Sequence, residues 1–511
     1  MTLFVKNAQI HRFPLAARTA KLSCVPLAFA FALGLTGCYP HEPYQKPAVA
    51  TAPAYKENQP GTASANAEGW KQATPNDAML RGKWWEVFGD PELNGLEEKL
   101  NINNQNIAEY FQSYMAARAE VAQIRASYWP TVSVGGSFSR SRTPAMQSTT
   151  TAKGVATTTS TMQLPLSVSW EPDFFGKIRN EVNEYTAAAQ VSAADLENER
   201  LSEQSSLAQY YFELRSEDSL QKVYDDTLAD YRLALQLTQS LVDTGIDTDE
   251  DLAEAKAAVH AAEANAVAIH TTRAQYEHAI ALLVGESAGS FSLPVRTLET
   301  KVPTVPTGLP SELLERRPDI AAAERTMAEA NALIGVGKAA YFPTVSLSLA
   351  GGTESPNWSN LLNWNNRYWS LGPSVSETVF DGGARKAALA GYRAKYQADA
   401  ATYRQTVLNA FKEVEDYLVA SRQLADQVGK ERLAVDDYTN YRNIALTRYK
   451  TGLDTYLNVL TAETSLLSNQ ITLEQLRAQQ MTATVELIAA LGGGWDNTQL
   501  PTEADIRGKK K

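Results

Sequence analysis

The chain has 511 residues, of which 44% are hydrophobic, and it carries a net charge of −11 at pH 7. This negative charge argues against a nucleic-acid partner. After residue 38 no uninterrupted apolar run reaches the length of a membrane span, so no transmembrane helix is expected there.

The first 37 residues have the pattern of a lipoprotein signal peptide. Four basic residues precede a short apolar segment at 22–35, which is the usual order in a signal peptide. The segment ends in Leu35-Thr36-Gly37-Cys38, which resembles the bacterial lipobox and predicts an N-acyl diglyceride and palmitate on Cys38. The alternative is an ordinary signal peptide that happens to contain a cysteine.

Signal cleavage would change both the charge and the cysteine content. Removing the four basic residues from a net charge of −11 leaves −15, and Cys24 is discarded, so no disulfide can form. Tyr39 follows the lipidation site, where lipoproteins kept at the inner membrane usually have Asp. The resemblance therefore favours the outer membrane.

Residues 38–82 are rich in Pro, Ala, Thr and Asn and predict an extended tether. The folded body begins near Lys83. Asp90 before Pro91 is a favourable helix start, and apolar residues then recur at helical spacing to about Ser127.

Two pairs of short segments predict β-strands. Residues 131–139 alternate with period two, a Ser/Thr-rich loop follows at 142–161, and 163–170 predicts the second strand. The second half of the chain has matching strands near 344–352 and 367–377. A length of about nine residues suits strands that cross a bilayer. Aromatic residues flank them, as in membrane-interface belts, although a small soluble sheet with core aromatics remains the alternative.

The chain is one unit built twice. The segment 244–248 reads Thr-Gly-Ile-Asp-Thr, and 207 residues later 451–455 reads Thr-Gly-Leu-Asp-Thr. Each is predicted to be the tip of a helical hairpin. A helix from 177 to about 242, with its counterpart from about 385 to 451, would extend roughly 100 Å. Shorter helices return at 249–284 and 456–491. In chain order, the sequence predicts a signal peptide at 1–37, a tether at 38–82, a first repeat at 83–285 with its β-hairpin at 131–170, a linker at 286–310, a second repeat at 311–492 with its β-hairpin at 344–377, and a tail at 493–511.

Four strands leave an open sheet with two unsatisfied edges in lipid, and they cannot close a barrel around side chains. Several protomers must therefore contribute strands to one barrel. The predicted fold class is a mixed α+β membrane protein in which long helical hairpins continue that barrel as a tube.

The whole mature chain resembles the outer-membrane efflux lipoproteins of the TolC/OprM type, in particular their NodT-like branch. The residues that carry this resemblance are the lipobox at Cys38, Pro43-Tyr44-Gln45-Lys46-Pro47, Trp84-Trp85, Arg316-Arg317-Pro318-Asp319-Ile320, Tyr341-Phe342-Pro343, Phe380-Asp381-Gly382-Gly383 and the two tips. The resemblance implies a homotrimer with a 12-stranded barrel in the outer membrane and a 12-helix α-barrel across the periplasm. It also implies docking to a periplasmic adaptor and an inner-membrane pump.

The hairpin tips are the candidate functional site. Asp247 and Asp454 have two interpretations: they are N-caps of the returning helices, or, repeated by symmetry, they line a narrow mouth that favours cations. The resemblance matches Asp251 to an Asp of the family's first tip and Tyr449 to a Tyr that, with an Arg, latches neighbouring tips; Lys450 stands where that Arg is common. Asn458 and Thr461 stand where Asp is frequent, which puts an acidic selectivity ring in doubt. Negative charge at the mouth would then come from Asp247, Asp251 and Asp454.

The resemblance also assigns adaptor docking to the tip surface formed by Thr244, Gly245, Ile246, Thr451, Gly452 and Leu453. The alternative for each glycine is a helix C-cap.

The predicted function is passive conduction of small molecules out of the cell, with energy supplied by a partner pump. Two alternatives stay open: an exit channel for type I protein secretion, and a non-conducting lipoprotein that only spans the periplasm. An enzyme is not expected, because no phosphate loop, nucleophile elbow or Cys/His cluster is present. Neither a metal nor a cofactor other than the lipid on Cys38 is predicted.

Overall fold

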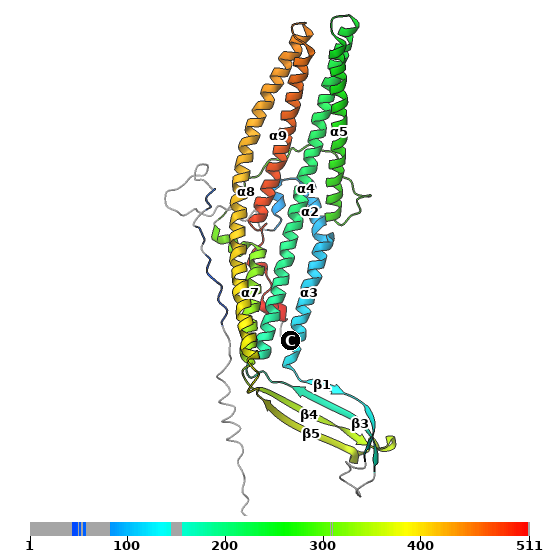
Figure 1. The fold of residues 1–511 in the computed structure, drawn as a ribbon, viewed down its shortest axis with the longest axis vertical. Coiled ribbons are helices and arrows are strands. Elements are labelled where there is room, and N and C mark those ends of the chain that lie inside the picture. The colour runs from blue at the N-terminus through cyan, green and yellow to red at the C-terminus, as the bar shows by residue number, and fades with distance from the viewer. Residues whose placement is uncertain are drawn as a thin grey trace, which may run out of the picture.

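The structure, a computed structural model, describes residues 43–49, 51–52, 55–57, 82–144, 156–306, 308 and 310–508. The signal peptide and Cys38 lie outside the described residues. Two helical hairpins stand side by side, and a single β-sheet lies at the opposite end of the molecule from their tips (Figure 1).

The long helices match between the two halves of the chain. The helices α4 (Lys177–Asp243) and α8 (Ala384–Lys450) each have 67 residues, which is about 100 Å of helix. The returning helices α5 (Asp249–Leu283) and α9 (Tyr456–Ala490) each have 35 residues. All four boundaries keep the spacing of 207, so the predicted helices and the repeat are confirmed.

Shorter helices complete each half. They are α2 (Pro91–Asn103), α3 (Gln105–Arg125), α6 (Leu313–Arg316), α7 (Pro318–Ala339) and the terminal α10 (Glu503–Arg507). Of these, α3 and α7 lie next to the sheet, and α2 lies midway along the molecule (Figure 1). Asp90 caps α2 as predicted, because its side chain accepts hydrogen bonds from the backbone N–H groups of Glu92 and Leu93.

The first helix is divided, where the sequence predicted a continuous one. Asn104 adopts an extended conformation, and its side chain accepts a hydrogen bond from the N–H of Ile107 and so caps α3. Its amide also donates to the carbonyl of Leu283 at 3.0 Å and to Glu203 at 3.2 Å. These long-range bonds stabilise the break.

The helices form one layer in which α4 and α8 run the full length. Between them lies α7 in the half near the sheet and α9 in the half near the tips, while α3 and α5 pack on the other side of α4. The main core lies midway along the layer, where Trp84, Trp85 and Phe88 pack against Tyr211 and Phe212.

The sheet is antiparallel, with the order β1-β3-β4-β5 and with β2 also paired to β3. Its strands are β1 (Thr131–Val134), β2 (Ser137–Thr143), β3 (Thr157–Trp170), β4 (Thr344–Ser355) and β5 (Arg367–Ser376). Three strands are longer than predicted. In the first half, residues 142–143 and 157–161 belong to strands rather than to the Ser/Thr-rich loop.

The first predicted strand is interrupted rather than ended. The pairing continues from Val134 opposite Leu166 to Ser137 opposite Gln163 without a shift of register. Between these pairs Gly135 lies against Pro165, which has no N–H to donate to the ladder. The missing bond separates β1 from β2, so the sheet is four strands wide.

The register gives the sheet two chemically different faces. One, called the apolar face below, carries large hydrophobic side chains from every strand, among them Val132, Val134, Phe138, Leu164, Leu166, Val168, Leu347, Leu349, Trp369, Leu371 and Val375. The other, the polar face, is lined by serines. On it Ser133 pairs with Ser167, and Ser346 with Ser374, each at 2.7 Å between hydroxyl oxygens.

In the described part of the chain, no helix combines the length and the apolar character needed to cross a membrane.

Candidate functional site

Both hairpin tips end their long helix with the same backbone motif. Gly245 and Gly452 have φ angles of 73° and 72°, in the left-handed region where a side chain is strained. The N–H of Gly245 bonds to the carbonyl of Val242, and that of Ile246 to Leu241. This is a Schellman cap, so both glycines act as helix C-caps, a role compatible with the predicted docking surface. The same motif leaves Ile246 and Leu453 more than 70% exposed at the ends of the molecule.

The predicted N-caps are off by one residue. Thr248 and Thr455, rather than Asp247 and Asp454, occupy the N-cap positions of α5 and α9. The Thr248 hydroxyl accepts from the N–H of Asp251 and donates to its carboxylate at 2.5 Å. The carboxylate of Asp247 is therefore not used to cap the helix and is available for a contact outside its own hairpin.

Tyr449 makes that contact from the other hairpin. Its hydroxyl donates to Asp247 Oδ2 at 2.6 Å and lies 2.8 Å from the hydroxyl of Thr238. Because the single phenolic hydrogen goes to Asp247, Thr238 is the donor in the second bond. Burial, together with the bond to Asp247, raises the pKa of Tyr449. The phenol therefore stays protonated and keeps donating at neutral pH.

An apolar cluster surrounds this bond and joins the two hairpins. Tyr449 and Tyr456 lie 5.7 Å apart between ring centroids, and they pack with Ala234, Ala255 and Ala445. The hydroxyl of Tyr456 is buried and has no hydrogen-bond partner among the described residues. The two tyrosines thus differ in one respect: only Tyr449 forms a polar link between hairpins.

The second tip has its own polar contacts within one hairpin. Asp454 accepts hydrogen bonds from Arg448 Nε at 3.2 Å, from the backbone of Thr455 and from the amide of Asn458. These donors lower the pKa of Asp454, the Asn458 bond first. Asn458, a position where the resemblance led us to expect Asp, is thus the main partner of the tip carboxylate.

Lys450 and Thr461 form no hydrogen bond or ion pair between the hairpins within the described residues, although Lys450 lines a cavity of about 300 Å³ together with residues of α4. Lys450 is exposed and has no ion-pair partner in the described part of this chain. The Thr461 hydroxyl bonds to the backbone of its own helix, at the carbonyl of Leu457. Within one chain, Tyr449 therefore forms a hydrogen bond with Asp247. Lys450 forms no ion pair with any of the carboxylates predicted for the gate.

A second contact between hairpins was not predicted from the sequence. Arg442 on α8 forms an ion pair with Asp230 on α4, and Glu463 on α9 lies beside both in a cavity of about 100 Å³. Glu463 is 5% exposed, and one of its carboxylate oxygens has no hydrogen-bond partner among the described residues. Burial raises the pKa of this carboxyl to about 7, with Arg442 opposing the shift and Asp230 adding to it.

A sequence signal for these residues exists in the repeat itself. At the spacing of 207, Tyr449 corresponds to Val242, and Glu463 corresponds to Lys256. In each link the partner on α8 is a position where the repeats differ in polarity, since Tyr449 corresponds to Val242 and Arg442 to Leu235, whereas the acidic partners Asp247 and Asp230 correspond to Asp454 and Asp437.

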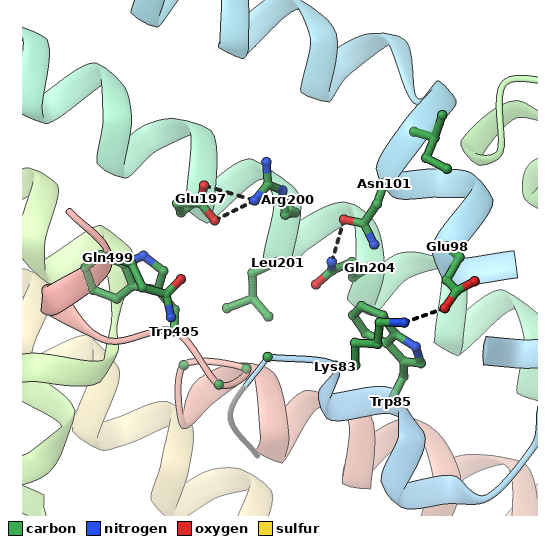
Figure 2. A pocket seen from close by; sticks show the side chains of 15 residues that line it. Lys83, Trp85, Glu98, Asn101, Glu197, Arg200, Leu201, Gln204, Trp495 and Gln499 are labelled. Carbon is green, nitrogen blue, oxygen red and sulfur yellow. Dashed lines mark hydrogen bonds and ion pairs between the residues drawn. The ribbon is translucent and has the colours of Figure 1, made fainter. Parts of the chain in front are cut away.

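A cavity of about 430 Å³ lies far from the tips. It adjoins Leu201 on α4, which is about 60 Å of helix away from Asp243. Figure 2 shows Lys83 paired with Glu98, and Asn101 bonded to Gln204, around this space. Its walls come from both ends of the described chain, so it is a junction between the N-terminal and C-terminal segments.

Among the described residues, no group of three or more His, Cys, Asp or Glu side chains is placed to hold a metal ion.

Comparison with known families identifies the chain. The model of the outer membrane efflux protein family matches residues 96–286 and 309–493, which is one match for each repeat. The chain belongs to the outer membrane efflux protein family. Members of this family are channels of the outer membrane that extend into the periplasm, and this efflux protein has the same place and the same role.

Individual relatives align over nearly their whole length. The toluene efflux pump outer membrane protein TtgC of Pseudomonas putida is 31% identical, over 91% of this chain and 94% of its own. The cation efflux system protein CusC of Escherichia coli is 29% identical, over 92% of this chain and 99% of its own.

Solved structures share the fold. The outer-membrane channel OprN superposes with a TM-score of 0.80 at 28% identity, covering 90% of this chain and 100% of that chain. A CusC structure gives a TM-score of 0.77 at 26% identity, covering 89% of this chain and 100% of that chain. The predicted family and fold class are therefore confirmed.

Proposed function

We propose that three copies of this efflux protein form a passive exit duct for small molecules, and that the duct is supplied by a periplasmic adaptor and an inner-membrane pump. The observation that carries the proposal is the sheet, which has one apolar face, one serine-lined face and two unpaired edges. Such a sheet suits lipid on one side and water on the other.

The two edges are β5 on one side and the line of β1 and β2 on the other. Unpaired backbone groups cost several kcal/mol each in lipid, so the edges need partners. Pairing β5 of one copy with β1 and β2 of the next satisfies both edges. Three copies of a sheet four strands wide then give a closed barrel of the size predicted from the sequence.

The edges of the helical layer support the same arrangement. On one side α8 exposes Leu408, Leu433 and Ile444, and on the other side α5 exposes Val267 and Leu282. A neighbouring subunit packed against each edge of the layer would cover these apolar side chains. The long helices would then continue the barrel as a tube of about 100 Å.

The tips are the proposed gate and docking surface. The bond from Tyr449 to Asp247 links the two hairpins of one copy, and Lys450 and Asp251 are proposed to form contacts between copies. Adaptor binding at the exposed tip residues, Ile246 and Leu453 among them, would favour an arrangement in which these contacts are broken. Arg448 forms an ion pair with Asp454 and offsets its charge, whereas the side chains bonded to Asp247 and Asp251 are neutral hydroxyl groups, so Asp247 and Asp251 are the main candidates for an acidic lining.

The cargo is proposed to be small and chemically varied. Relatives of nearly equal identity are named for toluene and for cations, which supports a duct that makes few specific contacts with what it carries. The lipid on Cys38 is proposed to hold the N-terminus at the outer membrane.

The test is electrical and structural. Purified protein should insert into planar bilayers with steady conductance steps, and its particles should have three-fold symmetry with a central opening. Exchange of Asp251 and Lys450 for Ala should raise conductance and uptake of large antibiotics. A water-soluble monomer, or trimers that conduct nothing, would overturn the proposal in favour of a structural lipoprotein.

A further inference from the structure

The end of the sheet farthest from the helices carries three arginines on its apolar face. Arg140 and Arg142 alternate with serines on β2, so they share the face of Phe138. Arg367 begins β5 and shares the face of Trp369. Each arginine therefore lies just beyond the apolar part of an edge strand, and all three are exposed.

These charges contrast with the rest of the protein. The chain as a whole has a net charge of −11, yet segments 131–170 and 344–376 together contain four basic residues and one acidic residue. That acid, Glu354, pairs with Gln163 across the strands and belongs to the polar face. The arginines of the apolar face consequently have no carboxylate beside them.

The described contacts of the arginines fit an incoming anion. Arg140 and Arg142 form no ion pair within the described residues. The Nε of Arg367 donates to the carbonyl of Trp364 at 2.8 Å, and its guanidinium lies over that indole ring. Its two terminal nitrogens make no hydrogen bond in the described part of the chain. A guanidinium fixed in this way presents its remaining donors in a fork that suits phosphate oxygens.

Arg367 stands on one edge of the sheet, and Arg140 and Arg142 stand on the other. When copies close into a barrel, a step that rests on the proposed function, β5 of one copy lies beside β2 of the next. The three arginines then gather at each seam between copies, on the lipid side and at the outer end. Like charges held together there repel one another unless an anion lies between them.

We propose that each seam binds the phosphate groups of an anionic glycolipid in the outer leaflet. The apolar face continues directly below the arginines, so acyl chains and headgroup meet matching surfaces on one ligand. Exposed Trp358, Leu362 and Trp364 extend the same end of the sheet with side chains suited to a membrane interface. Basic residues near an anionic membrane surface each contribute about a fivefold gain in affinity.

The test uses purified, detergent-solubilised protein and native mass spectrometry. The probes are bis-phosphorylated lipid A and the same lipid after enzymatic removal of both phosphates. The native protein should bind the phosphorylated form at least tenfold more tightly. Exchange of Arg140, Arg142 and Arg367 for Gln should reduce that affinity on the order of tenfold to a hundredfold, while exchange of all three for Lys should retain most of it.

A matched control removes three other exposed cations, through Arg404→Gln, Lys430→Gln and Arg432→Gln on α8, and should leave lipid binding unchanged. Equal binding of the two lipids by the native protein would overturn the inference. So would unchanged affinity in the arginine-to-glutamine variant. Conductance and particle symmetry are measured on the same samples. A conducting trimer without lipid preference refutes only this inference, whereas a non-conducting monomer refutes the proposed function.

Discussion

Tyr449→Phe is expected to shift the duct toward its open state. The change removes one hydroxyl, which donates to Asp247 at 2.6 Å and accepts from Thr238 at 2.8 Å, and leaves the ring in its cluster; the magnitude below counts the bond to Asp247. A hydrogen bond to a charged group contributes about 1.5 to 3 kcal/mol. The lower value applies, because Asp247 is only partly buried. If three symmetric copies release together, about 4.5 kcal/mol is lost from the closed state, which raises the open-to-closed ratio by at most roughly a thousandfold.

The neighbouring Tyr456→Phe is the matched control for this experiment. It makes the same chemical change in the same cluster, but the Tyr456 hydroxyl has no partner to lose among the described residues. The closed state should therefore be unaffected or slightly stabilised. The assay is single-channel open probability in planar bilayers, together with uptake of a large hydrophilic antibiotic by whole cells. An unchanged open probability in Tyr449→Phe refutes the latch, and equal increases in both variants would assign the effect to ring packing.

Three further predictions address burial, backbone and lipidation. The pKa of Glu463, about 7 when folded against 4.5 unfolded, means that its contribution to stability is present at low pH and is lost as pH rises from about 4.5 to 7. Glu463→Gln should therefore stabilise the protein by up to about 3 kcal/mol at pH 8 and have little effect at pH 4.5 in urea unfolding; equal effects at both pH values would contradict this. Gly452→Ala should cost about 1 kcal/mol from its left-handed backbone, without a clash, because no atom lies within 4 Å of the new Cβ. If the Gly452→Ala variant folds normally but efflux in cells is lost, the loss reports impaired docking of the adaptor at this tip. Unchanged efflux would argue against docking there. Cys38→Ser should abolish palmitate labelling, and persistent labelling would contradict the lipobox assignment.

The sequence by itself determined the repeat and the long helices. The two tips at 244–248 and 451–455 gave the spacing of 207, and every long helix keeps it. Local signals suffice for these features, because Pro and Gly punctuate the chain and a helix satisfies its own backbone hydrogen bonds. Asp90 and Pro91 fixed a helix start for the same reason.

Only the tertiary structure decided which polar groups meet. Asn104 breaks a helix through bonds to residues about a hundred or more positions away, and Pro165 interrupts a strand that is not its own. Asp247, for which N-capping was one prediction, accepts a hydrogen bond from Tyr449 on the other hairpin. Each of these three interactions depends on which segments pack side by side. The residue pattern within one segment does not reveal which other segment packs against it. The alternation of each strand could be predicted from sequence. The register across four strands was needed to place Arg140, Arg142 and Arg367 on one face.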